Sequence, residues 1–133
     1  MTLQEEIEYW TMIEPTEEND FSLFQEKLEQ DPLVLFHATK SLNCDSIISN
    51  GFRSAQCLGI GELTSVSYAK RSSGCLYHIG NPVSENHVVF AVRFENLQQE
   101  GIRNNYSDIH VYSHDIQPII LGYCEIQCGY RLK

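Results

Sequence analysis

Apolar residues near the start of the chain recur at helical spacing. Thr2 followed by Glu5 forms a capping-box pattern, in which each residue can satisfy a free backbone N–H at a helix start. Ile7 and Trp10 then follow three residues apart, which places them on one helix face. The pattern predicts an amphipathic helix over about residues 2–13.

A second helix is expected after the break at "EPTEEND". Asp20 is a residue type that caps helices, and Phe24 and Leu28 share one helical face before Pro32 ends the segment. Residues 1–31 are therefore expected to form a helical cover over the rest of the chain.

From residue 33 onward the pattern changes to short strands rich in β-branched residues, separated by turns. A helix is expected between the first two strands, over residues 42–50, because Gly51 follows it where a left-handed cap is favoured. We predict a single α+β domain over residues 1–133. The predicted strands cover residues 33–37, 87–94, 108–112 and 118–128.

Composition narrows the choice of partners. The chain has 133 residues, 42% of them hydrophobic, which is enough for one domain with a core. Its formal net charge of -9 argues against direct binding to nucleic acid, whose phosphates would be repelled. A basic protein, such as one that itself binds nucleic acid, is the better electrostatic match. A solvated acidic face also needs no partner.

The cysteines and the N-terminus indicate where the protein is found. Five cysteines, an odd number without paired CxxC spacing, fit neither a disulfide framework nor a zinc ribbon. The N-terminus has no basic region followed by an apolar run, and no stretch reaches the roughly 20 apolar residues that span a bilayer. We expect a soluble cytoplasmic protein that keeps its thiols reduced and does not bind membranes.

A polar triplet at the end of the first predicted strand is the first candidate for chemistry. His37, Ala38 and Thr39 follow four apolar residues and precede the predicted helix. A histidine and a hydroxyl at the mouth of a buried strand can be satisfied by a ligand in a cleft. The alternative is that His37 bonds a nearby carbonyl group and has only a structural role.

Other candidate site residues are better explained by a structural role than by a role in binding or catalysis. Gly59 and Gly61 lack the third glycine of a dinucleotide fingerprint and are interpreted as loop hinges. His110 and His114 flank a predicted strand and are expected to point outward. No metal site is expected, because the remaining candidate zinc ligands lack paired spacing. These are Cys57, Cys75, His78 and His87.

Three sequence blocks, in order, resemble the ADP-ribosyltransferase superfamily, in its PARP-like or diphtheria-toxin-like branch. The first block, "FHATKSLNCDSIISNGF", is similar to the family's His-Gly-Ser/Thr strand end and the helix after it, with Ala38 at the glycine position. The second block is "SVSYAKRSSGCLYHIG" and the third is "YSDIHVYSHDIQPIILGYCEIQ". The resemblance covers about residues 33–127 and implies a split β-sheet with the motif residues on three strands.

The second and third blocks depart from the family pattern at two positions. A literal alignment puts Ser67 at the motif tyrosine position, whereas a one-residue bulge would let Tyr68 serve there. Asp108 stands where most members have glutamate. Within the second block, Ser72 or Ser73 and then Tyr77 follow residues 65–69 and match the family's serine and tyrosine.

The resemblance implies a role for each matched residue toward NAD+ as co-substrate. Asp108 would stabilise the positive charge that develops on the ribose when nicotinamide leaves. Tyr68 and Tyr77 would stack on the nicotinamide ring. His37 and Thr39 would bind the adenosine ribose. Two further groups would contact the carboxamide, namely the Ala38 backbone and Ser73.

The resemblance implies a mono-ADP-ribosyltransferase that transfers ADP-ribose from NAD+ to a protein target. No tract is suited to building a polymer, and the compact acidic chain fits a stand-alone phage or bacterial factor that acts on a host or defence protein. Two other classes stay open. Ala38 and Ser67 favour a non-catalytic NAD or ADP-ribose reader, and the charge favours an acidic inhibitor that occludes a basic surface.

Overall fold

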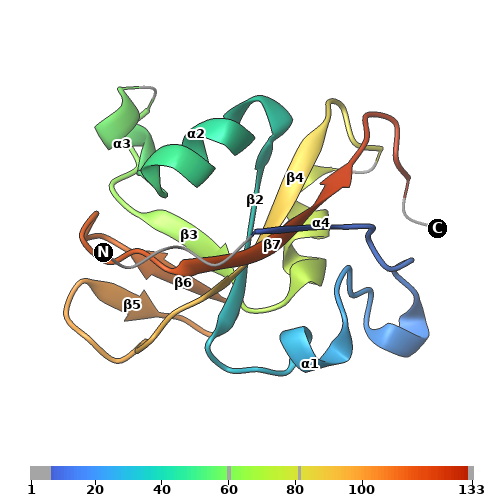
Figure 1. Cartoon of the computed structure of the whole chain (residues 1–133), viewed down its shortest axis with the longest axis horizontal. Helices are drawn as coiled ribbons and strands as arrows, with labels where there is room; N and C mark the ends of the chain where they lie inside the picture. The colour runs from blue at the N-terminus through green and yellow to red at the C-terminus, as the bar shows by residue number, and fades with distance from the viewer. Residues whose placement is uncertain (1–6, 60, 81, 132–133) are drawn as a thin grey trace.

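The computed structural model describes residues 7–59, 61–80 and 82–131, which form a mixed α/β structure around one sheet (Figure 1). The strands are β1 (Glu8–Trp10), β2 (Val34–Lys40), β3 (Val66–Ala69), β4 (His87–Arg93), β5 (Ile102–Asn104), β6 (Asp108–Val111) and β7 (Ile119–Ile126). The α-helices are α1 (Glu26–Glu29), α2 (Cys44–Asn50), α3 (Ala55–Leu58) and α4 (Ser72–Ile79), and two 3₁₀ turns cover Glu17–Asn19 and Ser41–Asn43.

The strands of the described residues pair in the order β1-β7-β4-β2-β3-β6-β5. Only β1 and β7 run parallel, and all other pairs are antiparallel. β2 pairs with β4 along its whole length, but it pairs with β3 only where Phe36 lies opposite Ala69. The sheet therefore splits between β2 and β3 at its centre.

Side chains bury on both faces of the sheet. Leu35 belongs to one hydrophobic cluster, whereas its neighbours Val34 and Phe36 belong to the other, as expected when successive strand residues point to opposite faces. Helix α2 packs on the first cluster through Ile47, and α4 contributes Leu76 to the second. The described residues thus form a mixed α/β structure, which is compatible with the predicted α+β class.

The strands and the helix predicted after residue 33 are confirmed. Each predicted strand overlaps one of β2, β4, β6 and β7, and the predicted helix is the second 3₁₀ turn together with α2. Gly51 ends the helix with φ of 83°, in the region that favours glycine. A Cβ there would lie 2.8 Å from Oε1 of Gln117, which accepts the Phe52 N–H at 2.9 Å.

The predicted first helix is wrong over its described part. Residues 2–6 lie outside the described residues, and Glu8–Trp10 form a strand parallel to β7. Gly122 makes this pairing possible, because a Cβ there would come within 2.7 Å of both the Glu8 carbonyl oxygen and the Trp10 ring. Pairing with a distant strand has overridden the local helical pattern.

The predicted second helix is also wrong in extent. Thr16 and Asn19 form a capping box around Glu17–Asn19, so the first turn starts before Asp20. Asp20 and Phe21 then adopt positive φ values of 58° and 60°, which an α-helix does not allow. Only Glu26–Glu29 becomes α-helical. The expected helical cover is a strand, turns and one short helix.

A buried carboxylate joins the segment before β2 to helix α4 by hydrogen bonds. Glu29, 5% exposed, accepts a hydrogen bond from the Ser72 N–H at 3.1 Å and another from the Ser72 hydroxyl. The Ser72 hydroxyl in turn accepts the Leu23 N–H at 2.8 Å. Because removing one partner of such a buried network leaves another polar group unsatisfied, the segment is held by polar contacts as well as apolar ones.

Candidate functional site

A cleft of about 580 Å³ opens where the sheet splits. Its walls come from β2, from β3 with the residues just before it, from the start of β6, from helix α4 and from the segment around Arg53. Five of the residues predicted from sequence line this one cleft. They are His37, Ala38, Ser67, Tyr77 and Asp108.

His37 is held in one tautomer at the cleft wall. Its Nδ1 lies 2.8 Å from the Ser67 carbonyl oxygen, which can only accept, so Nδ1 carries the proton. Burial lowers the pKa of His37, an effect that the bond to Ser67 partly offsets and the nearby His78 reinforces. The neutral ring leaves Nε2 as a hydrogen-bond acceptor, which suits a ligand hydroxyl.

Ala38 presents backbone groups at the split. It pairs with Val89 of β4 on one side and has no partner in β3 on the other. Its backbone makes a hydrogen bond with the Cys75 thiol of α4. Burial raises the pKa of Cys75, so this thiol stays neutral and offers Ala38 only a weak partner. A ligand amide could replace that contact at little cost.

Asp108 begins β6 at the edge of the cleft. Its Oδ1 accepts a hydrogen bond from Nδ2 of Asn105 at 3.0 Å, and its Oδ2 lies 3.3 Å from Nε2 of His110. The bond from Asn105 is the main reason that the pKa of Asp108 is lowered, and His110 and Lys70 add to the effect. The side chain is therefore an oriented carboxylate that stays ionised at neutral pH.

Three predicted residues do not line the cleft. Tyr68 is 1% exposed and packs in the core against Phe52 and Phe94, at ring centroid distances of 5.4 and 5.1 Å. The hydroxyl of Thr39 accepts a bond from Asn43 at 3.0 Å. Ser73, on α4, is half-buried and is not among the residues that line the cleft.

The alternation of side chains along β3 explains why Ser67 lines the cleft and Tyr68 does not. Ser67 and Tyr68 are neighbours on β3 and point to opposite faces, and of the two Ser67 lines the cleft. The larger tyrosine enters the core, where its burial stabilises the fold, and the smaller Ser67 is left exposed. The expectation that Tyr68 stacks on a ligand conflicts with this register, which leaves Tyr77, 93% exposed, as the tyrosine that lines the cleft.

Sequence reasoning missed other polar residues at this site. Arg53, Ser65 and His78 line the cleft, and His110 contacts two lining residues, Asp108 at 3.3 Å and Ser65 at 2.9 Å. His110 was expected to point outward. The alternation of side chains along β6 could have indicated that His110 lies near Asp108, since residues 108 and 110 share a strand face.

The cleft differs in charge from the rest of the chain. Arg53 and Asp108 are the lining residues with full charges at neutral pH, one of each sign. The chain as a whole has a net charge of -9. A ligand that carries phosphate groups therefore meets a cation at the cleft instead of the acidic surface found elsewhere.

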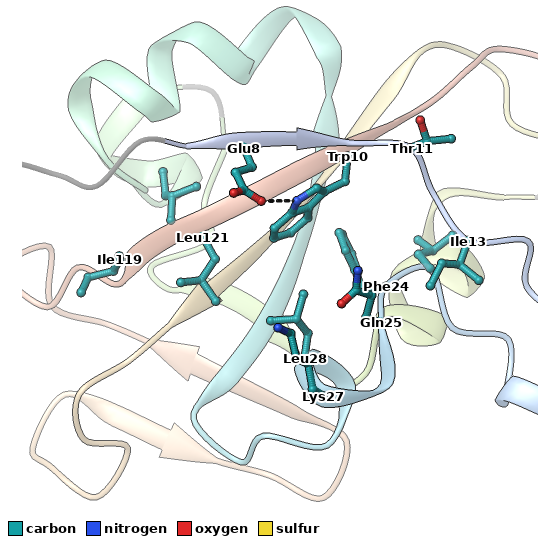
Figure 2. Close-up of a pocket in the computed structure, with 12 residues that line it drawn as sticks. Glu8, Trp10, Thr11, Ile13, Phe24, Gln25, Lys27, Leu28, Ile119 and Leu121 are labelled. Atoms are coloured by element: carbon teal, nitrogen blue, oxygen red, sulfur yellow. Dashed lines mark hydrogen bonds between the residues drawn. The ribbon is translucent and has the colours of Figure 1, made fainter.

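A second hollow of about 480 Å³ lies between β1, β7 and α1 (Figure 2). Its walls include the apolar side chains of Trp10, Leu28 and Leu121. The one carboxylate that faces it, on Glu8, accepts a hydrogen bond from the Trp10 indole at 2.6 Å. No nucleophile and base meet among its described lining residues, so the chemistry is concentrated in the cleft at the split.

The described part of the chain has neither a cluster of metal ligands nor a membrane-spanning helix. No three His, Cys, Asp or Glu side chains come together there in a way that could hold a metal ion. None of its helices is both long enough and apolar enough to span a bilayer. All five cysteines are unpaired thiols, with Cys57 and Cys128 exposed.

No protein-family model matches the sequence, and a search of curated proteins found no match. We therefore infer the function from the residues and the geometry of the cleft.

Proposed function

We propose that the protein is a mono-ADP-ribosyltransferase that transfers ADP-ribose from NAD+ to a protein target. The observation that carries the proposal is the convergence of His37, Ala38, Ser67, Tyr77 and Asp108 on one cleft. These residues come from segments far apart in sequence, on β2, β3, α4 and β6. The same three strands that carry the resemblance, β2, β3 and β6, are neighbours in the sheet.

Each group in the cleft has a role in this reaction. Nicotinamide leaves with the electrons of its glycosidic bond, and the ionised Asp108 stabilises the positive charge that develops on the ribose. Tyr77 stacks on the cationic nicotinamide ring, and the Ala38 backbone binds its carboxamide. His37 accepts a ribose hydroxyl through Nε2. The guanidinium of Arg53 pairs with the pyrophosphate.

The acidic surface suggests the kind of target. Outside the cleft the chain is strongly acidic, so a basic protein would be attracted to it and nucleic acid would be repelled. We therefore place a basic nucleic-acid-binding protein first among targets. A cytoplasmic location fits the free thiols.

One observation favours a second candidate, a reader that binds NAD+ or ADP-ribose without turnover. Tyr68 is buried, so Ser67 and the exposed Tyr77 are what remains to enclose the nicotinamide ring. Stacking from one side alone holds the ring less firmly for reaction. The reader and the transferase share the prediction of NAD+ binding and differ in turnover.

Two measurements on the purified chain separate these candidates. A thermal shift with NAD+ reports binding, because a ligand at a hundred times its dissociation constant adds about 2.7 kcal/mol to the free energy of unfolding. Incubation with labelled NAD+ and cell lysate reports transfer. Binding with transfer supports the transferase and binding alone supports the reader. If millimolar NAD+ gives no thermal shift and no calorimetric heat, both are excluded and the acidic inhibitor remains.

A further inference from the structure

A second set of polar contacts lies beside the residues assigned to NAD+. Oγ of Ser65 is 2.9 Å from Nδ1 of His110, and Nε2 of the same ring is 3.3 Å from Oδ2 of Asp108. Ser65 and Asp108 both line the cleft, and His110, which does not line it, contacts both. A hydroxyl, an imidazole and a carboxylate are thus joined in series.

The direction of these hydrogen bonds follows from the charge of Asp108. Its pKa is lowered, chiefly by Asn105, so the carboxylate is ionised and can only accept. Nε2 of His110 must then carry the proton. Nδ1 of the neutral ring is left to accept the hydroxyl hydrogen of Ser65, which is the arrangement in which an imidazole acts as a base toward a serine.

The surroundings of His110 support this assignment. On β5, Arg103 lies opposite His110, and on β3 its partner is Ser67. The ring of Tyr112 stacks beside the imidazole at a centroid distance of 6.4 Å. Asp108, two residues earlier on the same strand, accepts the Nε2 proton of His110 and so fixes the tautomer.

We propose that Ser65 is an activated nucleophile and that the chain modifies itself at this residue with ADP-ribose. This inference rests on the proposed function, since the electrophile is the ribose carbon of NAD+ bound beside Asp108. It adds a modification site and the chemical class of the acceptor, a serine hydroxyl. His110 acts through Ser65 as its base, and Asp108 orients the imidazole.

The step balances without any other reactant. Oγ of Ser65 forms a bond to the ribose carbon while the bond from that carbon to the nicotinamide nitrogen breaks. Nicotinamide departs neutral with the electron pair, and the hydroxyl proton moves to Nδ1 of His110. The product is a serine O-glycoside that lies in the cleft and fills it, so a modified chain is blocked against further NAD+. The modification is therefore self-limiting at one ADP-ribose per chain.

The test incubates the purified full chain with NAD+ and measures nicotinamide release, intact mass and the modified residue by peptide fragmentation. We expect the mass to rise by one ADP-ribose, with the group on Ser65. Ser65→Ala should lose the modification. Thr64→Ala removes the neighbouring exposed hydroxyl and should keep it. His110→Gln retains an amide donor for Asp108 but has no basic nitrogen, so the modification rate should fall about 10²–10⁴-fold.

The outcomes separate this inference from the proposed function. Nicotinamide release with Ser65 unmodified would overturn the inference and leave the transferase intact. No release, either from the chain alone or after addition of cell lysate, would refute the transferase, and a fluorophosphonate probe, which reacts with activated serines, would then decide about Ser65. Labelling of Ser65 that is lost in His110→Gln supports the nucleophile. An unlabelled Ser65 refutes it.

Discussion

The two edges of β2 differ in what they do for the protein. On one edge, β2 pairs with β4 over seven residues, from Val34 to Lys40, and Phe90, Val89 and Ala91 of β4 are completely buried. On the other edge it pairs with β3 at a single residue and then diverges, and the candidate site lies in the space between. One strand therefore supports the core on one side and opens a cleft on the other.

Because of this difference, we expect substitutions on the paired edge to change the stability of the fold and substitutions at the split to change the chemistry of the cleft. Side chains on the paired edge contact other apolar side chains, so their loss leaves a cavity. Side chains at the split contact solvent and the cleft, so their loss changes ligand contacts and leaves the core as it was. Substitutions on the two edges should therefore change different measured quantities, and four predictions test this.

The largest effect is expected on the paired edge. Phe90→Ala removes a fully buried ring that contacts Phe52 and Tyr123 at centroid distances of 5.6 Å. The free energy of unfolding should fall by about 3–5 kcal/mol, measured by urea denaturation. Leu42→Ala is the matched control, because Leu42 is 77% exposed and its loss should change stability by less than about 0.5 kcal/mol. A small loss for Phe90→Ala would show that this edge does not carry the core.

The next effect is expected at the split and concerns rate. Asp108→Asn keeps the shape of the side chain but removes the charge that acts on the developing cation, so transfer should fall about a hundredfold or more. NAD+ affinity should change little, because the charge acts mainly in the transition state. The side chain is 38% exposed, so the melting temperature should stay within a few degrees of wild type.

A folded Asp108→Asn protein that still transfers at the wild-type rate would contradict the role of Asp108. Glu125 on β7 would then be the next carboxylate to test. A protein that loses activity together with its melting transition would show a structural role instead, and would weaken the contrast between the two edges.

A smaller effect separates the two tyrosines. Tyr77→Ala removes an exposed ring from the cleft and should weaken NAD+ binding by about 0.5–2 kcal/mol, without loss of stability. Tyr68→Phe keeps the buried ring and should leave NAD+ binding unchanged, because that residue does not line the cleft. Calorimetric titration of both variants measures this. Weaker binding in Tyr68→Phe alone would mean that Tyr68 turns toward the ligand.

Much of the sheet could be predicted from the sequence because the residues of its central strands are of types that favour strands on their own. The runs that became β4 and β7 are rich in valine and isoleucine, and Gly51 marked the end of α2. The edge strand β1 could not be predicted, because Ile7 and Trp10 fit a helix as well as a strand. Its structure depends on the space left by Gly122, more than a hundred residues away.

Most of the residues that form the candidate site could be predicted from the sequence, but the strand face on which each of them lies could not. The order of His37, a small residue, Tyr77 and Asp108 could be read along the chain, and all of these line the cleft. The choice between Ser67 and Tyr68 depended on which face of β3 is buried, and a single strand of four residues does not fix that. The contact of His110 with Ser65 joins two strands whose pairing the sequence does not specify.

The smallest effect sought is the pH dependence of stability that comes from His37, which stands at the boundary between the two edges. Burial lowers its pKa in the folded chain, so in acid the unfolded chain binds a proton more readily than the folded one. The contribution of neutral His37 is complete above the unfolded pKa of about 6.5 and is lost as the pH falls below it. The free energy of unfolding should therefore be lower at pH 5 than at pH 7.5.

His37→Asn keeps an N–H donor for the Ser67 carbonyl but does not titrate, so its drop in unfolding free energy over this pH range should be smaller. His114→Asn, at an exposed histidine, is the control and should keep the full drop. Equal drops in wild type and His37→Asn would show that the histidine is hydrated at the split, and that the paired edge does not bury it.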